Sequence, residues 1–170
     1  MPTSSTNRPR ESRRRDTILN CQRTVRLPVR QLEEFFIRAR RKLRLPPGSL
    51  TVCLVTNAEI AKWNRAYRRK DGPTDVLSFP AEDPPPRLAR KSLRHAPPIA
   101  PASAGRYLGD IAIAPAVARR NAGRFGRTLS QEMRILILHG MLHLMGYDHE
   151  TDTGQMDRRE RRLHCELGLL

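Results

Sequence analysis

Three histidines lie close together in the last quarter of the chain, in the segment His139-Gly-Met-Leu-His143-Leu-Met-Gly146-Tyr-Asp-His149. If this segment is helical, His139 and His143 project from one face, because they are four residues apart. Gly146 can take a left-handed backbone conformation, and the resulting turn can bring His149 back toward the other two rings. Three neutral imidazoles that converge in this way form an open zinc site with water in the fourth position. The spacing therefore predicts a catalytic metal site.

The same spacing matches the extended metalloprotease pattern H-E-x-x-H-x-x-G-x-x-H at every position but one. The glutamate of that pattern is the general base for peptide hydrolysis, and here its position is taken by Gly140. Zinc is the expected metal, although nickel, copper or iron also accept nitrogen donors. Two other histidines lack ligand spacing to the cluster: His95 falls in a proline-rich segment, and we expect His164 at the surface of the last helix.

The histidine helix needs a scaffold, and hydrophobic periodicity predicts one. An apolar helix from about 129 to 145 begins at a capping box of Thr128 and Gln131 and is expected to be buried. Asn57 is the expected cap of a second helix. The predicted strands are 17–22, 50–55, 75–79 and 107–114, and the other predicted helices run from about 32 to 43, 57 to 67, 115 to 122 and 153 to 167. This order predicts a single α+β domain, with a small mixed sheet of about four strands covered by about five helices.

Charge restricts the partners of the protein. The formal net charge is +15 and the sequence pI is about 11.3, which predicts attraction to polyanions such as RNA. Residues 1–16 are expected to be a disordered basic arm, and residues 82–105 a flexible proline-rich loop within a domain spanning 17–170. Three scattered cysteines and the lack of an apolar stretch long enough to cross a bilayer predict a cytoplasmic protein with reduced thiols and no membrane partner.

Three ordered motifs give the chain a resemblance to a known family, the YbeY endoribonucleases. The motifs are NRAYRRKDGPTDVLSFP (64–80), YLGDIAIA (107–114) and LHGMLHLMGYDH (138–149). The resemblance implies a single-strand-specific, metal-dependent endoribonuclease that acts in 16S rRNA 3′-end maturation and ribosome quality control, with the small ribosomal subunit as a partner. It also implies one zinc ion held by His139, His143 and His149, and a catalytic Arg68. The arm and the long loop depart from the family pattern.

A guanidinium at Arg68 fits this chemistry, because phosphodiester cleavage adds negative charge to the phosphoryl oxygens in the transition state. The alternative is a solvated arginine in a basic stretch. The general base stays unassigned among Asp148, Asp110 and Asp75, and each of these carboxylates could equally be structural. Two other functions stay open from the residues alone: a metalloprotease-like hydrolase, which Gly140 argues against, and a non-catalytic ribosome-assembly factor with a structural metal.

Overall fold

The computed structural model describes residues 18–81, 107–147 and 153–169. In this part of the chain, a four-stranded mixed sheet is combined with five α-helices. The strands are β1 (Ile18–Asn20), β2 (Leu50–Leu54), β3 (Val76–Pro80) and β4 (Gly109–Ile113), and the α-helices are α1 (Val29–Lys42), α2 (Asn57–Trp63), α4 (Pro115–Arg124), α5 (Leu129–Leu144) and α6 (Gln155–Leu167). The predicted fold class, a single α+β domain with a small mixed sheet, is confirmed. The expected arm at 1–16 and loop at 82–105 lie outside the described residues.

The sheet has the strand order β1-β2-β4-β3. β1 runs parallel to β2 and β2 runs parallel to β4, whereas β3 pairs antiparallel with β4, with Ser78 opposite Ile111. The crossover between β1 and β2 contains α1, as a parallel connection requires. Among the described strands, β3 is therefore an edge strand that joins the sheet through β4.

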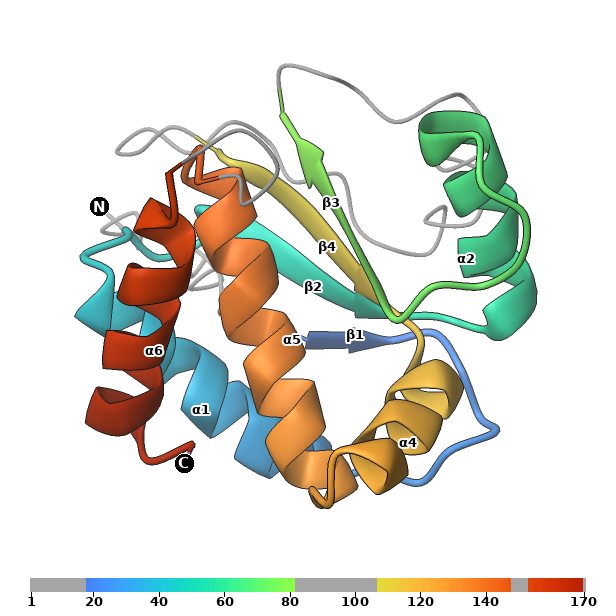
Figure 1. Cartoon of the computed structure of the whole chain (residues 1–170), viewed down its shortest axis with the longest axis horizontal. Coiled ribbons are helices and arrows are strands. Elements are labelled where there is room, and N and C mark those ends of the chain that lie inside the picture. Colours follow the sequence, from blue (N-terminus) through green and yellow to red (C-terminus); the bar gives the residue numbers. More distant parts are fainter. Residues whose placement is uncertain (1–17, 82–106, 148–152, 170) are drawn as a thin grey trace, which may run out of the picture.

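Apolar side chains alternate between the two faces of the sheet, as the two-residue period of a strand dictates. Val52 and Ile111 face a core formed with α1, α5 and α6, whereas Cys53 and Ala112 face a smaller core with α2. Figure 1 shows α5 crossing the sheet, with α6 and α1 alongside it. The histidine helix α5 is thus covered on one side by the sheet and on the other by helices, which explains its nearly continuous apolar sequence.

Helix caps decide where two of these elements begin. The predicted capping box of α5 is present, because Thr128 accepts from the Gln131 backbone and Gln131 accepts from the Thr128 backbone. The prediction of Asn57 as the cap of α2 is wrong. Thr56 takes this position in a second capping box with Glu59, so Asn57 becomes the first helical residue.

The end of α2 changes its hydrogen bonding and continues as a π-helix, η1 (Asn64–Arg68). Arg69 then ends it with a left-handed backbone, φ 53°. The buried Asn64 side chain donates to the carbonyl of Gly72 at 2.9 Å and so ties the following turn to the helix. The sequence pattern predicted an ordinary helix here. π-helical turns are rare in proteins overall, but those that do occur are frequently found at functional sites.

Two further observations on the described residues concern the cysteines and membrane-spanning helices. Cys53 is buried and Cys21 and Cys165 are exposed, and all three are free thiols. No helix among the described residues is long and apolar enough to cross a membrane.

Candidate metal centre

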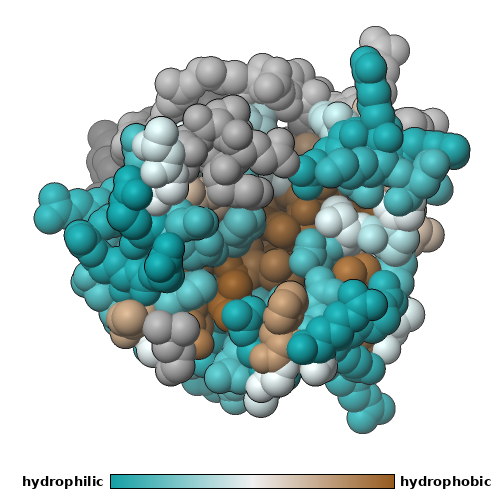
Figure 2. All heavy atoms as spheres, viewed as in Figure 1, coloured by the Kyte–Doolittle hydropathy of each residue, from teal (hydrophilic) through white to brown (hydrophobic). Residues whose placement is uncertain are grey.

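A cleft of about 590 Å³ lies between the edge strand β3 and helix α5. Figure 2 shows a hollow at the centre of this face, with hydrophobic side chains at its floor and hydrophilic ones around it. β3 contributes residues 76–80 to the lining, α5 contributes four side chains, and the end of η1 contributes Tyr67 and Arg68. The cleft therefore brings together segments that are about seventy residues apart in the sequence.

His139 and His143 line this cleft from the same face of α5. Their Nε2 atoms are 3.1 Å apart, and their rings are nearly perpendicular, at 73°. Two donor atoms bound to one tetrahedral zinc ion would lie about 3.4 Å apart, given bonds of about 2.0–2.1 Å. The pair of imidazole nitrogens therefore fits a zinc ion with little rearrangement. Within the described part of the chain, no further His, Cys, Asp or Glu completes a group of three.

The predicted third ligand, His149, and the candidate base Asp148 lie outside the described residues. The chain leading to them is described as far as Tyr147. Gly146 has a φ of 90°, the left-handed backbone that the sequence predicted at this turn. Gly146 and Tyr147 both line the cleft, so the described chain ends beside the histidine pair.

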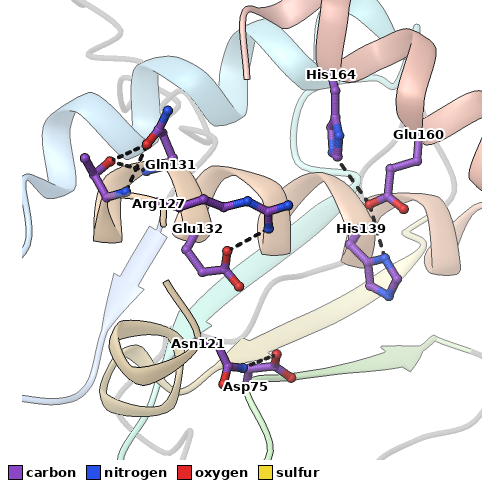
Figure 3. Close-up of polar contacts among 9 residues, drawn as sticks. Asp75, Asn121, Arg127, Gln131, Glu132, His139, Glu160 and His164 are labelled. Atoms are coloured by element: carbon purple, nitrogen blue, oxygen red, sulfur yellow. Dashed lines mark hydrogen bonds and ion pairs between the residues drawn. The ribbon is translucent and has the colours of Figure 1, made fainter. Parts of the chain in front are cut away.

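Glu160 on α6 contacts His139, one member of the histidine pair. Its Oε1 atom lies 3.2 Å from His139 Nδ1, on the opposite side of the ring from the nitrogen that faces His143. Figure 3 shows the two side chains pointing toward each other from α5 and α6. The contact joins two different helices and has no signature in local spacing, so Glu160 could not be predicted from the sequence pattern.

His164 lies one helical turn beyond Glu160, with its Nε2 atom 3.8 Å from the same carboxylate oxygen. The expectation that His164 is a surface residue is wrong, because its side chain is only 13% exposed. Burial lowers the pKa of His164, although the Glu160 charge opposes this shift. Burial acts to raise the pKa of Glu160, but the hydrogen bond from His139 and the nearby imidazoles outweigh it and lower that pKa. Glu160 is therefore a carboxylate at neutral pH.

Arg68 lines the same cleft as the two histidines. It is exposed and is the last residue of η1, so its position depends on the π-turn and on the tie made by Asn64. The neighbouring Arg65 behaves differently, since it forms an exposed ion pair with Asp71 at 3.0 Å. Arg68 thus differs from the neighbouring Arg65 in that it lines the cleft.

The two described candidate bases have structural contacts. Asp75 accepts from the Val76 backbone at 2.9 Å and from Asn121 Nδ2 at 3.0 Å, so it joins the start of β3 to α4 (Figure 3). Asp75 also lines the cleft. Asp110 accepts from the Tyr107 hydroxyl, and burial raises its pKa. Its side chain faces away from α5, because the adjacent Ile111 packs against that helix.

Gly140 sits where the metalloprotease pattern has its glutamate, and a side chain at this position would have to displace its neighbours. A Cβ at this position would lie 2.7 Å from Ile111 Cγ2 on β4. The Gly140 carbonyl accepts from Ser78 Oγ of β3 at 3.4 Å. Helix α5 thus lies directly against the sheet at Gly140, and this close approach places the adjacent His139 at the edge of β3.

The fold and the site together define a class: a small, basic α+β enzyme with paired imidazoles and a guanidinium in one cleft. Comparison with known proteins identifies the family. The family model described as Endoribonuclease YbeY matches residues 15–168. The chain therefore belongs to the endoribonuclease YbeY family, as its sequence motifs predicted.

Individual relatives agree over most of the chain. It is 36% identical over 151 residues to "Endoribonuclease YbeY" of Sulfurovum sp., covering 89% of this chain and 90% of that protein. It is 41% identical over 124 residues to the protein of the same name from Moorella thermoacetica, covering 72% and 74%. A solution structure of a Thermotoga maritima protein is similar with a TM-score of 0.52 and 25% identity, over 89% of this chain and 88% of that one.

Proposed function

We propose that the protein is a single-strand-specific, zinc-dependent endoribonuclease that acts in 16S rRNA 3′-end maturation and ribosome quality control. The observation that most supports this function is the convergence of the histidine pair and Arg68 in one cleft. The relatives carry the name endoribonuclease, which gives the substrate class. Single-stranded RNA, in particular rRNA, and the small ribosomal subunit are the proposed partners, and the cytoplasm is the proposed location.

The proposed zinc ligands are His139, His143 and His149. Imidazole nitrogen is a usual donor for zinc, and three protein ligands leave a fourth position open, as in catalytic sites. When bound, the ion supplies Lewis-acid stabilisation of the charge that develops on the phosphoryl oxygens. The 3.1 Å separation of the two described Nε2 atoms supports this assignment.

Arg68 is the proposed catalytic partner of this centre. A guanidinium presents planar, bidentate donors that match phosphate oxygens, and it stays charged at every physiological pH. Its place at the cleft lets it approach a phosphodiester that also meets the histidine pair.

The structure favours this function over the two alternatives. A metalloprotease would need a base, and a side chain at Gly140 would collide with Ile111. An assembly factor with a purely structural metal would need no arginine in the cleft beside the ligands, and structural zinc sites usually have four protein ligands. Neither alternative explains why Arg68 and the histidine pair line the same cleft.

Purified protein tests the proposal with two measurements. Elemental analysis should find about one zinc per chain, and labelled RNA should be cleaved when single-stranded but not when duplex. The His139→Ala, His143→Ala double variant should lose both zinc and cleavage, whereas the matched His95→Ala variant should keep both. Unchanged zinc in the double variant would refute the ligand assignment. Cleavage of casein without cleavage of RNA would favour the metalloprotease alternative, and zinc binding without either activity would favour the assembly factor.

A further inference from the structure

The position of Glu160 behind His139 has a consequence for the proton on that ring. A neutral imidazole carries one proton, and the nitrogen that donates a hydrogen bond leaves the other nitrogen with a lone pair. An ionised carboxylate only accepts, so the contact of 3.2 Å between Glu160 Oε1 and His139 Nδ1 holds the proton on Nδ1. The Nε2 atom of His139 then presents its lone pair toward His143 and the cleft, which is the form that binds a metal.

The rest of α6 holds Glu160 in place for this contact. Met156, Leu163 and Leu167 recur at helical spacing and are at most 6% exposed, so this stripe anchors the helix in the core. Glu160 falls on the same stripe, four residues after Met156, and its side chain is only 16% exposed. Arg38 of α1 also donates to the Leu167 carbonyl at 3.1 Å and fixes the end of the helix. The carboxylate therefore approaches His139 from a rigid support.

A carboxylate at this depth is costly to bury unless it is paired with a hydrogen-bond donor. Four arginines lie on the same helix, at positions 158, 159, 161 and 162, and the core-facing stripe directs Glu160 away from solvent toward His139. His164 packs beside it and adds a second imidazole to the same oxygen at 3.8 Å. The arrangement is that of a carboxylate–histidine pair, in which the carboxylate orients a metal ligand and raises its basicity.

We infer that Glu160 is a positioning residue for the metal centre: it fixes the tautomer and orientation of His139 so that Nε2 can bind the metal. This inference rests on the proposed function for the identity of the ion, but the tautomer itself is a property of the protein alone. Glu160 contacts neither the metal nor the RNA and acts only through His139. Neither the sequence motifs nor the family name assigns this residue.

Three variants test the inference. Glu160→Ala removes the acceptor, Glu160→Gln keeps an acceptor oxygen but removes the charge, and Glu166→Gln is the matched control. Glu166 is on the same helix and also forms an ion pair, with Lys42 at 3.1 Å, but it is more exposed and faces α1. Zinc affinity is measured by competition with a chromogenic chelator. The histidine tautomers of the metal-free proteins are measured by long-range ¹H–¹⁵N spectra of the imidazoles.

Glu160→Ala should weaken zinc binding by about 10- to 100-fold, and the signal of His139 should lose its Nδ1–H character. Glu160→Gln should keep the tautomer and lose less affinity, because its amide oxygen still accepts. Glu166→Gln should match the wild type in both measurements. The inference is overturned if Glu160→Ala keeps the wild-type tautomer and affinity, or if Glu166→Gln loses as much affinity as Glu160→Ala. If the wild type binds no zinc, the proposed metal dependence fails. The tautomer of His139 then still tests whether Glu160 fixes the proton on that ring.

Discussion

Arg68 and the histidine pair reach one cleft from elements on opposite faces of the sheet. Arg68 belongs to η1, which continues α2, whereas His139 and His143 belong to α5. In the proposed function, the histidines hold the metal, and the guanidinium of Arg68 stabilises charge on phosphate. This division can be tested because each half of the site can be removed without the other.

We expect Arg68→Ala to keep its zinc and its thermal stability but to lose RNA cleavage by about 10² to 10³ in rate, since this is the usual cost of removing one charge-stabilising donor. Arg68→Lys should restore only part of the rate, because an ammonium lacks the bidentate fork. Single-turnover cleavage, with zinc content measured on the same samples, checks both expectations.

Arg65→Ala is the control for Arg68. Its side chain is 77% exposed and pairs with Asp71 at the surface. Loss of Arg65 should weaken RNA binding slightly and in a salt-dependent way, with the single-turnover rate unchanged. If Arg65→Ala and Arg68→Ala slow cleavage equally at saturating RNA, Arg68 is one member of a basic surface and has no separate function in the reaction.

Single residues differ in how far the sequence predicts them. His139 and His143 could be paired in advance, because helical spacing alone brings their rings to one face. Glu160 could not be paired with His139, because the contact spans 21 residues and depends on how α6 docks against α5. His164 was misplaced for the same reason. The basic sequence of α6 predicts exposure, but the helix turns its stripe of Met156, Glu160 and Leu163 inward.

At the scale of elements, hydrophobic periodicity located the described strands and α-helices. The ends were predicted less well, since Thr56 and Asn57 are both good caps and only the reciprocal bond of Glu59 decides between them. The π-turn of η1 was not predicted, because no residue type marks the change from α to π hydrogen bonding. The close packing of α5 on β4 was also not predicted, since Gly140 marked only a missing side chain.

This packing predicts an unusual effect of adding one methyl group. Gly140→Ala should lower the free energy of unfolding by about 1–2 kcal/mol, because the Cβ at 2.7 Å from Ile111 Cγ2 overpacks the interface. Gly123→Ala in α4 is the matched control, because a Cβ there meets nothing within 4 Å. It should raise the same free energy by up to about 1 kcal/mol through helix propensity. Urea unfolding of the metal-free proteins measures both.

A double-mutant cycle identifies the partner. In an Ile111→Ala background, Gly140→Ala should become neutral or stabilising, since the colliding side chain is gone and only the propensity gain remains. A Gly140→Ala variant that is as stable as the wild type would show that α5 does not lie this close to β4.

At the scale of the whole molecule, the net charge of +15 predicts a steep salt dependence of RNA binding. The logarithm of the binding constant should fall linearly with the logarithm of salt concentration, by about 0.7 for each phosphate contacted on a single strand. Residues 1–16 contain five arginines, so deleting them should make the slope shallower while cleavage is retained. Fluorescence anisotropy across a salt series checks this.

A variant in which these five arginines are replaced by serine keeps the length of the segment. It therefore distinguishes the effect of the lost charge from the effect of the lost residues. It should show the same shallower slope as the deletion. If both variants keep the wild-type slope, the segment makes no contact with RNA, and the phosphate contacts come from the folded domain.

The strand order predicts that the β3 wall of the cleft opens more easily than the centre of the sheet. β2 lies between two strands and is buried at all five positions, whereas β3 pairs with a single strand, β4, in the described part of the chain and forms one wall of the cleft. Edge amides open with less free energy than central ones, so hydrogen exchange at Leu77, which pairs with Ala112 on β4, should be faster than at Cys53 on β2 in the free protein. RNA bound in the cleft should slow exchange in β3 and leave β2 unchanged. Equal protection of both strands without RNA would mean that this wall opens only when the whole domain unfolds.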